Sequence, residues 1–534
     1  MRHSTARIVR RILQTALLLG AAAALAACAA SDSSASAPGE YSNPAGNQGT
    51  GVGQSGSQDF GRFRGLIEKG ELPSPESLDS VGYFNEHKFK LPSPDCGEKV
   101  CVHGMFGVQG NMINGSNCTT VAIGFNTKLN PNDFDRPPLN MAIAVDVSGS
   151  MQGRPLQSVI SGLEKMVPKL EPKDRITLVA YSSAAKVVVR STPENDPERR
   201  QLETAIGELR AQGSTNIYAG LKRAIETVEE KANDDRQNRV ILLSDGKATA
   251  GIQSTDRIVN LGRAHAEEGI GLTTIGVGRE FDLDLMRKLS ENGAGNFYFL
   301  EDAAAVEEVF VDEVTTFLVP LAEKVNIHFD GAEAYSFRAA YGTRNWTGDD
   351  KSATIQIPAL FMASRTSVED VGPEGGRRGG GGIILLELVP TTDAKVLADT
   401  PPGSKVGDIT MTYRDPGSDE TVEQTVSVEN PLKPNAAPEV GEFSTDTVEK
   451  AFVALNIFAG FRMATDRASR GAAGAALDIL EPLRDNVDDW VAAKPDEDIE
   501  ADLEIMNQLI GIIESRAQRA ESRVGQRPNP WPRD

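Results

Sequence analysis

The feature that most constrains the fold is an apolar segment that leads directly into a cluster of polar side chains. Residues 139–145 are apolar except for Asn140, and Asp146, Ser148 and Ser150 follow at alternating positions. A short apolar run of this length is typical of a buried strand. Hydroxyl and carboxylate oxygens are hard ligands, which favour Mg²⁺, Mn²⁺ or Ca²⁺ over softer metals. The segment therefore predicts a divalent-cation site at the end of a strand.

Two later segments supply further oxygen ligands. Thr215 lies just before a predicted helix, and Asp245 follows a second apolar strand at residues 240–244. Ligands of an open α/β sheet bind beyond the carboxyl ends of its parallel strands, so a site is expected at the loop that contains Asp245. No cysteine or histidine lies near these positions in the sequence, which disfavours zinc.

These five residues resemble the metal-ion-dependent adhesion site of the von Willebrand factor A (VWA) family. Asp146, Ser148 and Ser150 match its Asp-x-Ser-x-Ser motif, and Thr215 and Asp245 match its later threonine and aspartate. The resemblance implies that the three hydroxyls bind the metal directly, while the two carboxylates act largely through water or as outer acceptors. It also implies an open coordination position that a partner protein fills with an acidic side chain.

The periodicity of the surrounding residues indicates the same fold. Residues 156–170 carry apolar side chains at helical intervals, residues 176–181 follow as a strand, and residues 186–190 form a short edge strand. Alternation continues to a last strand at 296–300 and a closing helix at 303–318. This order predicts a doubly wound, mostly parallel α/β sheet.

A different pattern follows the α/β segment. Strands are predicted at 324–329, 353–357 and 383–388, with a hairpin at 409–428 around a Pro-Gly-Ser-Asp turn. The glycine-rich segment 375–382 lacks the lysine and the strand-to-helix context of a phosphate-binding loop, so it is interpreted as a hairpin loop. Residues 444–523 show helical periodicity and predict a helical hairpin or three-helix bundle packed on the β domain.

The N-terminus has the pattern of a secretory signal peptide. Four arginines precede an apolar run at residues 12–25, which is too short for a comfortable permanent membrane span. Cys28 follows Leu-Ala-Ala, which resembles the bacterial lipobox and implies cleavage before a lipidated Cys28. We therefore expect a lipoprotein anchored to a bilayer in the bacterial cell envelope. The outer membrane is favoured, and the periplasmic and surface faces are both left open.

Three cysteines remain after lipidation, namely Cys96, Cys101 and Cys118. In an exported chain, an odd number favours one disulfide and one spare thiol. The alternative is a zinc site formed by the three cysteines and His103.

The chain is accordingly divided into six parts. They are a signal peptide at 1–27, a lipidated cysteine and flexible tether at 28–58, an N-terminal accessory region at 59–136, a VWA domain at 137–320, a β-sandwich-like domain at 321–435 and a helical C-terminal region at 436–534.

Composition and motifs narrow the function. The formal charge of −21 argues against nucleic acid as a partner. The sequence has no catalytic motif of the common hydrolase or nucleotide-binding types, and we expect no enzymatic activity. The leading hypothesis is metal-dependent protein–protein interaction or adhesion at the membrane. The alternatives are a channel-associated or stress-response envelope component, and a scaffold whose metal is not used for ligand capture.

Overall fold

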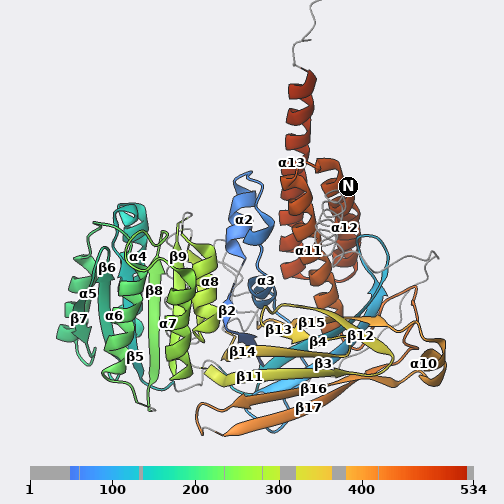
Figure 1. Ribbon diagram of the computed structural model, residues 1–534, viewed down its shortest axis with the longest axis horizontal. Coiled ribbons are helices and arrows are strands. Elements are labelled where there is room, and N and C mark those ends of the chain that lie inside the picture. Colours follow the sequence, from blue (N-terminus) through green and yellow to red (C-terminus); the bar gives the residue numbers. More distant parts are fainter. Residues whose placement is uncertain are drawn as a thin grey trace, which may run out of the picture.

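An α/β unit lies on one side of the molecule, and antiparallel strands with helices standing above them lie on the other (Figure 1). The computed structural model describes residues 49–58, 60–130, 136–233, 235–278, 281–300, 309, 320–363, 381–418 and 420–525. The predicted signal peptide, Cys28 and most of the predicted tether lie outside these residues. So do nearly all of the predicted closing helix at 303–318 and most of the glycine-rich loop at 375–382.

The α/β unit is built on a sheet whose described strands run in the order β2-β10-β9-β8-β5-β6-β7. These strands are β2 (Gly56–Ser57), β5 (Leu139–Asp146), β6 (Arg175–Tyr181), β7 (Ala185–Ser191), β8 (Gln237–Ser244), β9 (Ile270–Val277) and β10 (Asn296–Leu300). The helices are α4 (Arg154–Met166), α5 (Asp196–Gly207), α6 (Ile217–Glu229), α7 (Thr255–Glu267) and α8 (Leu283–Asn292), with 3₁₀ turns at Gly149–Met151 and Val167–Lys169. All strand pairs are parallel except that of β6 with the edge strand β7. The predicted doubly wound sheet is confirmed.

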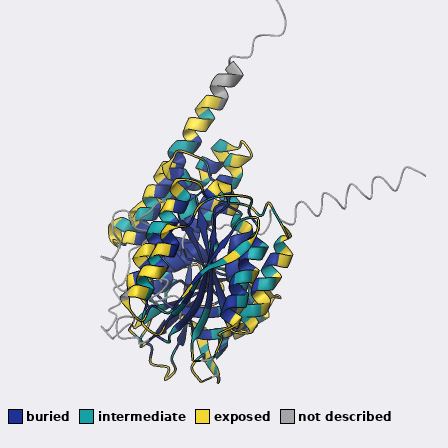
Figure 2. Cartoon of the chain, turned by 90° about the vertical axis from the view of Figure 1, so that its left-hand side faces the viewer, coloured by how far each residue is buried: buried dark blue, intermediate teal, exposed yellow. Residues whose placement is uncertain are grey.

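Helices cover both faces of this sheet, which is why its central strands are mostly apolar. Every residue of β5 is buried. Met141, Ile143 and Val145 of β5 belong to the core that α4 and α5 cover, whereas Ala142 and Ala144 face the core under α6, α7 and α8. Figure 2 shows the buried strands between helices whose outer surfaces are exposed.

The second unit is antiparallel, and its strands fall into two layers joined by β1. The strands are β1 (Thr50–Gln54), β3 (Cys101–Gly110), β4 (Asn117–Thr127), β11 (Pro320–Gly331), β12 (Tyr335–Tyr341), β13 (Trp346–Gly348), β14 (Ser352–Met362), β15 (Ile384–Pro390), β16 (Ser404–Arg414), β17 (Thr421–Asn430) and β18 (Glu442–Phe443), with a short helix α10 (Ala394–Asp399). β1 pairs with β4 through Thr50 and Gly51, and with β14 through Val52 to Gln54. Apolar side chains from both layers share one core, as expected for a sandwich-like domain.

Two predicted boundaries are wrong. The tether does not extend to residue 58, because β1 begins at Thr50 and β2 at Gly56, and each adds a strand to one of the two units. The accessory region at 59–136 is not separate, because β3 and β4 are paired strands of the β domain, and Thr119–Ile123 of β4 pair with β15. Apart from β2, the α/β unit is therefore inserted between β4 and β11 of the β domain.

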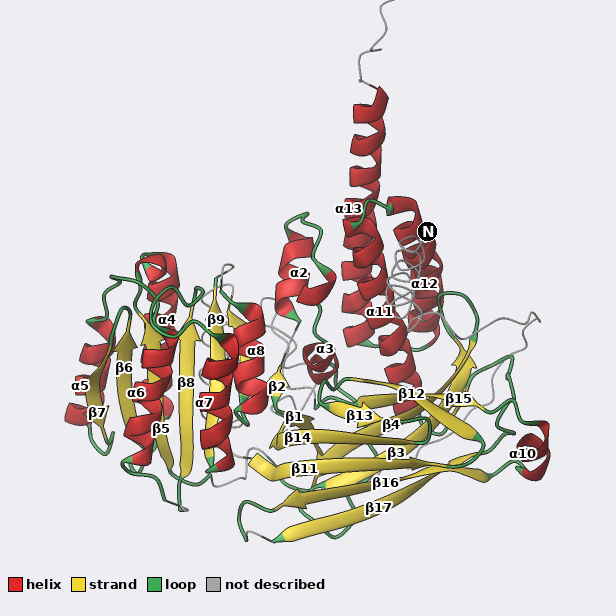
Figure 3. Cartoon of the chain, viewed as in Figure 1, coloured by secondary structure: helices red, strands yellow, loops and turns green. Residues whose placement is uncertain are grey.

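Three long helices end the described chain, as predicted: α11 (Asp446–Ser469), α12 (Ala473–Ala493) and α13 (Glu497–Gly525). They stand on the β domain beside the N-terminal helices α2 (Gly61–Glu68) and α3 (Ser80–Glu86) and a 3₁₀ turn at Pro75–Ser77 (Figure 3). Phe63 of α2 and Tyr83 of α3 contact Phe461 and Phe458 of α11, with ring centroids 5.5 and 5.6 Å apart. The aromatic stripe of α11 is thus part of a buried core, to which the accessory region also contributes side chains.

The cysteines follow the disulfide prediction. Cys96 and Cys101 form a disulfide, and Cys118 is a buried free thiol. His103 Nε2 lies 2.7 Å from the side-chain oxygen of Asn126. The alternative zinc site is therefore not formed in this structure.

Candidate metal centre

The parallel pairing of β5 and β8 brings two of the predicted segments together. Val145 is in register with Leu243, so both strands end at the same edge of the sheet. Asp146 is the last residue of β5, and Asp245 directly follows β8. Thr215 lies at the same end of the sheet, just before the start of α6. The N-cap of α6 is Asn216, which accepts a hydrogen bond from the Ala219 N–H.

Four of the five predicted residues are linked by a short chain of hydrogen bonds. Ser148 Oγ lies 3.0 Å from Ser150 Oγ, and Ser150 Oγ donates to Asp245 Oδ1 at 2.8 Å. The backbone N–H of Ser148 donates to Asp146 Oδ1 at 2.8 Å. Asp146, Ser148 and Asp245 are buried, whereas Ser150 is exposed. The cluster therefore opens to solvent on the Ser150 side.

Thr215 belongs to the same cluster. A Cβ placed on Gly246 would lie 3.7 Å from Ser150 Oγ and 3.8 Å from Thr215 Oγ1, so both hydroxyls border the space that this glycine leaves open. The carbonyl of Thr215 accepts hydrogen bonds from the backbone N–H groups of Thr249 and Ala250. Its own N–H donates to Thr249 Oγ1 at 2.9 Å. All five predicted side chains are thus gathered at one edge of the sheet.

The donor set fits a small, hard divalent cation. Neighbouring ligands in an octahedral magnesium site, each about 2.1 Å from the ion, lie roughly 2.9–3.0 Å apart. The Ser148 and Ser150 hydroxyls already have this spacing. Burial raises the pKa of the Asp146 carboxyl above its usual range, while hydrogen bonds from Ser148 and Ser244 oppose that rise. A nearby dication favours the ionised carboxylate.

Ser244 and Gly213 are site residues that the sequence analysis did not assign. Ser244 Oγ donates to Asp146 Oδ2 at 2.8 Å, so both oxygens of this carboxylate accept hydrogen bonds. Gly213 has a φ of +79°, and its carbonyl accepts from the Gly149 N–H at 3.0 Å. Ser244 is a polar residue at the end of an otherwise apolar strand, and this position is the sequence signal that could have identified it.

The predicted lipidation site falls outside the described residues. Among the helices that the structure does describe, none is both long and apolar enough to cross a bilayer.

Known proteins share the α/β unit. Residues 140–312 match the family model described as von Willebrand factor type A domain. The uncharacterized protein sll0103 of Synechocystis sp. is 32% identical over 181 residues, which are 33% of this chain and 41% of that protein. Inter-alpha-trypsin inhibitor heavy chain H2 of Mesocricetus auratus is 25% identical over 259 residues, which are 45% of this chain and 27% of that protein. The chain thus spans less than half the length of these curated relatives.

Among solved structures, von Willebrand factor type A from Catenulispora acidiphila aligns with a TM-score of 0.47 and 13% identity, covering 73% of this chain and 87% of that one. Members of the VWA family often bind a metal ion at this site and mediate protein interactions. Relatives such as the inter-alpha-trypsin inhibitor heavy chains are generally not enzymes. The chain contains a von Willebrand factor type A domain, which occupies residues 140–312.

Proposed function

We propose that this VWA domain binds Mg²⁺ and uses it to capture a protein partner that offers an acidic side chain. The observation that carries the proposal is the convergence of the five oxygen-bearing side chains at the carboxyl edge of the sheet. Three of these groups are neutral hydroxyls, so the bound cation keeps much of its charge. Its role is to attract a carboxylate oxygen of the partner.

Each residue has a distinct part in this function. Ser148, Ser150 and Thr215 hold the cation. Asp146 is fixed by hydrogen bonds from Ser148 and Ser244, which orient both carboxylate oxygens before any ion arrives. Asp245 accepts from Ser150, so it positions the one exposed hydroxyl of the cluster. The exposed side at Ser150 is where the partner approaches.

We also propose that the chain is an exported lipoprotein anchored through an acylated Cys28 in the bacterial cell envelope. Support comes from the basic and apolar N-terminal residues and the Leu-Ala-Ala-Cys segment. The folded part would then meet partners outside the cytoplasm, and its role would be binding, not catalysis. A Cys28→Ala variant should lose membrane fractionation. If it still sediments with membranes, the anchor is elsewhere.

Isothermal titration of Mg²⁺, Mn²⁺ and Ca²⁺ into the full chain is the direct test of the metal site. We expect binding that is lost in Asp146→Ala and retained in Asp256→Ala, since Asp256 is an exposed aspartate on α7 of the same domain. Full Mg²⁺ affinity in Asp146→Ala would refute the site.

Partner capture is tested separately with the same variants. Immobilised protein is exposed to envelope extract in Mg²⁺ or in EDTA, and bound proteins are quantified. The proposal requires a partner that is retained in Mg²⁺ by the wild type and Asp256→Ala, and lost with EDTA or Asp146→Ala. If metal binds but no capture depends on it, the ion has a structural role instead.

A further inference from the structure

The VWA domain carries a second group of potential metal ligands. It lies at the end of the sheet opposite the candidate metal centre, where α6 and α7 end. Glu229 is the last residue of α6, His265 lies in the last turn of α7, and Glu268 is the C-cap of α7. Both helices have 13 residues, and α6 begins beside Thr215. At a rise of about 1.5 Å per residue, the ends of the helices lie on the order of 20 Å from the first metal centre.

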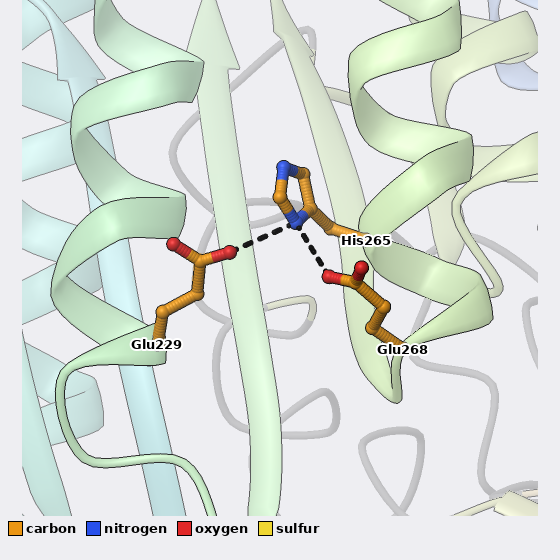
Figure 4. A group of neighbouring side chains, drawn as sticks. All are labelled: Glu229, His265 and Glu268. Carbon is orange, nitrogen blue, oxygen red and sulfur yellow. Dashed lines mark hydrogen bonds and ion pairs between the residues drawn. The ribbon is translucent and has the colours of Figure 1, made fainter.

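The three side chains converge on one point. His265 Nδ1 lies 3.0 Å from Glu229 Oε1 and 3.1 Å from Glu268 Oε2. The three potential ligand atoms all lie within 4.8 Å of one another. Figure 4 shows the carboxylates approaching the same ring nitrogen from two different helices.

One hydrogen on His265 Nδ1 cannot fully satisfy both carboxylates that face it. A ring nitrogen carries at most one hydrogen, and two carboxylates compete for the one on Nδ1. A zinc ion about 2.0–2.1 Å from each of three ligands would hold them roughly 3.3 Å apart in a tetrahedron. The two nitrogen–oxygen separations in the structure, 3.0 and 3.1 Å, are within a few tenths of that value.

The local field also favours a cation. Glu229 and Glu268 both lie at helix C-termini, where the partial charge of the helix is negative and a carboxylate is unfavourable by itself. A divalent ion brings two positive charges to a place where a protonated imidazole brings one.

We propose that Glu229, His265 and Glu268 bind Zn²⁺ and thereby join the ends of α6 and α7. One imidazole and two carboxylates suit zinc and leave a fourth position for solvent. The hydroxyl-rich site at the other edge suits magnesium, so one domain would bind two metals of different class. This inference does not depend on the proposed function of the first site.

The test uses Zn²⁺ alone, the full chain and the Asp146→Ala background, which removes the first metal centre. Equilibrium dialysis at neutral pH should show zinc binding that becomes at least tenfold weaker when His265→Ala is added. His328→Ala is the matched control, because His328 is an exposed histidine on β11 of the β domain. Equal zinc affinity with and without His265→Ala would overturn the proposal.

Two further measurements define the ligands. Glu229→Gln keeps the shape of the side chain and should also weaken zinc binding at least tenfold, and an unchanged affinity would overturn the three-residue site. X-ray absorption of the zinc-loaded Asp146→Ala protein should show only nitrogen and oxygen ligands, with one imidazole. Sulfur ligation would assign the zinc to a cysteine and contradict the proposal. The side chains of Glu229, His265 and Glu268 are 42%, 22% and 66% exposed, so these variants should keep the fold.

Discussion

The candidate metal centre of the VWA domain and the interior of the helical part use buried polar groups in opposite ways. In the VWA domain, buried oxygens gather beside hydroxyl donors at a sheet edge that is open to solvent. In the helical part, buried polar side chains pair with one another. His87 Nε2 lies 2.9 Å from Asp502 Oδ2, and Tyr83 O–H donates to the same oxygen at 2.5 Å, although Asp502 is 415 residues from His87 and 419 residues from Tyr83. The first arrangement suits a ligand, and the second holds distant segments together.

A cluster of charged residues also joins the two parts. This interface cluster consists of Asp79, Arg287, Glu291 and Arg344. Asp79 caps α3 and lies 3.2 Å from Arg287 Nε of α8, and it also contacts Arg344 of the β domain. Arg344 Nε lies 3.4 Å from Glu291 Oε1 of α8. The inserted VWA domain is thus tied to its host by ion pairs as well as by β2.

Asp502→Ala should have the largest effect, because it leaves His87 and Tyr83 without their shared acceptor in the interior. Each buried polar group that is left without a hydrogen-bond partner costs about 1–3 kcal/mol, and here two groups lose the same partner. Trp490 of α12 donates to Glu449 and reports on the helices, and residues 137–320 contain no tryptophan. Denaturant unfolding followed by tryptophan fluorescence should therefore shift strongly, while Mg²⁺ binding stays intact.

Glu504→Ala, an exposed change on the same helix, is the control and should leave the transition in place. If Asp502→Ala abolished Mg²⁺ binding as well, the metal centre would depend on the helical part, and the two would not be independent of each other.

The pH dependence of stability probes the interface cluster. Burial raises the pKa of Glu291 from 4.5 to about 7, against the opposing effect of Arg344. The folded chain then binds more protons than the unfolded chain between these values, so stability should fall as pH rises from about 4.5 to 7. The shift corresponds to a loss of up to about 3 kcal/mol. Glu291→Gln should remove this loss in denaturant unfolding measured across the window.

Glu267→Gln, an exposed substitution on α7, should keep the wild-type slope. An identical slope in Glu291→Gln would show that other groups produce it.

Ser244→Ala tests whether the metal centre depends on residues that do not touch the ion. Loss of the Ser244 hydroxyl removes one of the donors to Asp146. Outer residues of this kind typically change metal affinity 10–100-fold, or about 1.4–2.7 kcal/mol. We expect a loss in that range by Mg²⁺ titration. Ser290→Ala, at a buried serine on α8 that donates to the Arg287 carbonyl, should bind Mg²⁺ normally. Unchanged affinity in Ser244→Ala would show that the hydroxyl of Ser244 is not needed to orient Asp146.

Mg²⁺ itself should produce the smallest effect, and it should be confined to one part. At about ten times its dissociation constant, the ion adds about 1.4 kcal/mol to the stability of the domain that binds it. Calorimetry should show that only the VWA transition moves and that EDTA reverses the movement. A shift in Asp146→Ala, or an equal shift of the fluorescence transition, would contradict the assignment.

Local patterns were enough to predict the VWA domain. Its central strands are buried on both faces and are therefore mostly apolar, and its candidate site residues lie where strands end or a helix begins. In the β domain, the strands that follow the VWA domain were predicted, but β3 and β4 were not assigned to it. The reason is that the pairing of β4 with β15 joins residues more than 250 positions apart. The glycine-rich residues of β1 resemble a linker in composition, and their place in two sheet layers is set by backbone hydrogen bonds.

The sequence by itself determined the fold of the VWA domain and which five oxygen-bearing side chains lie at the ends of its strands and helix, because strand periodicity and the order of polar residues are local properties. Only the tertiary structure decided that Ser244 holds Asp146, that Asp79 joins α3 to α8, and that Glu229 meets His265. These contacts depend on the packing of elements that are remote in the chain, and no local pattern encodes which distant side chains will meet.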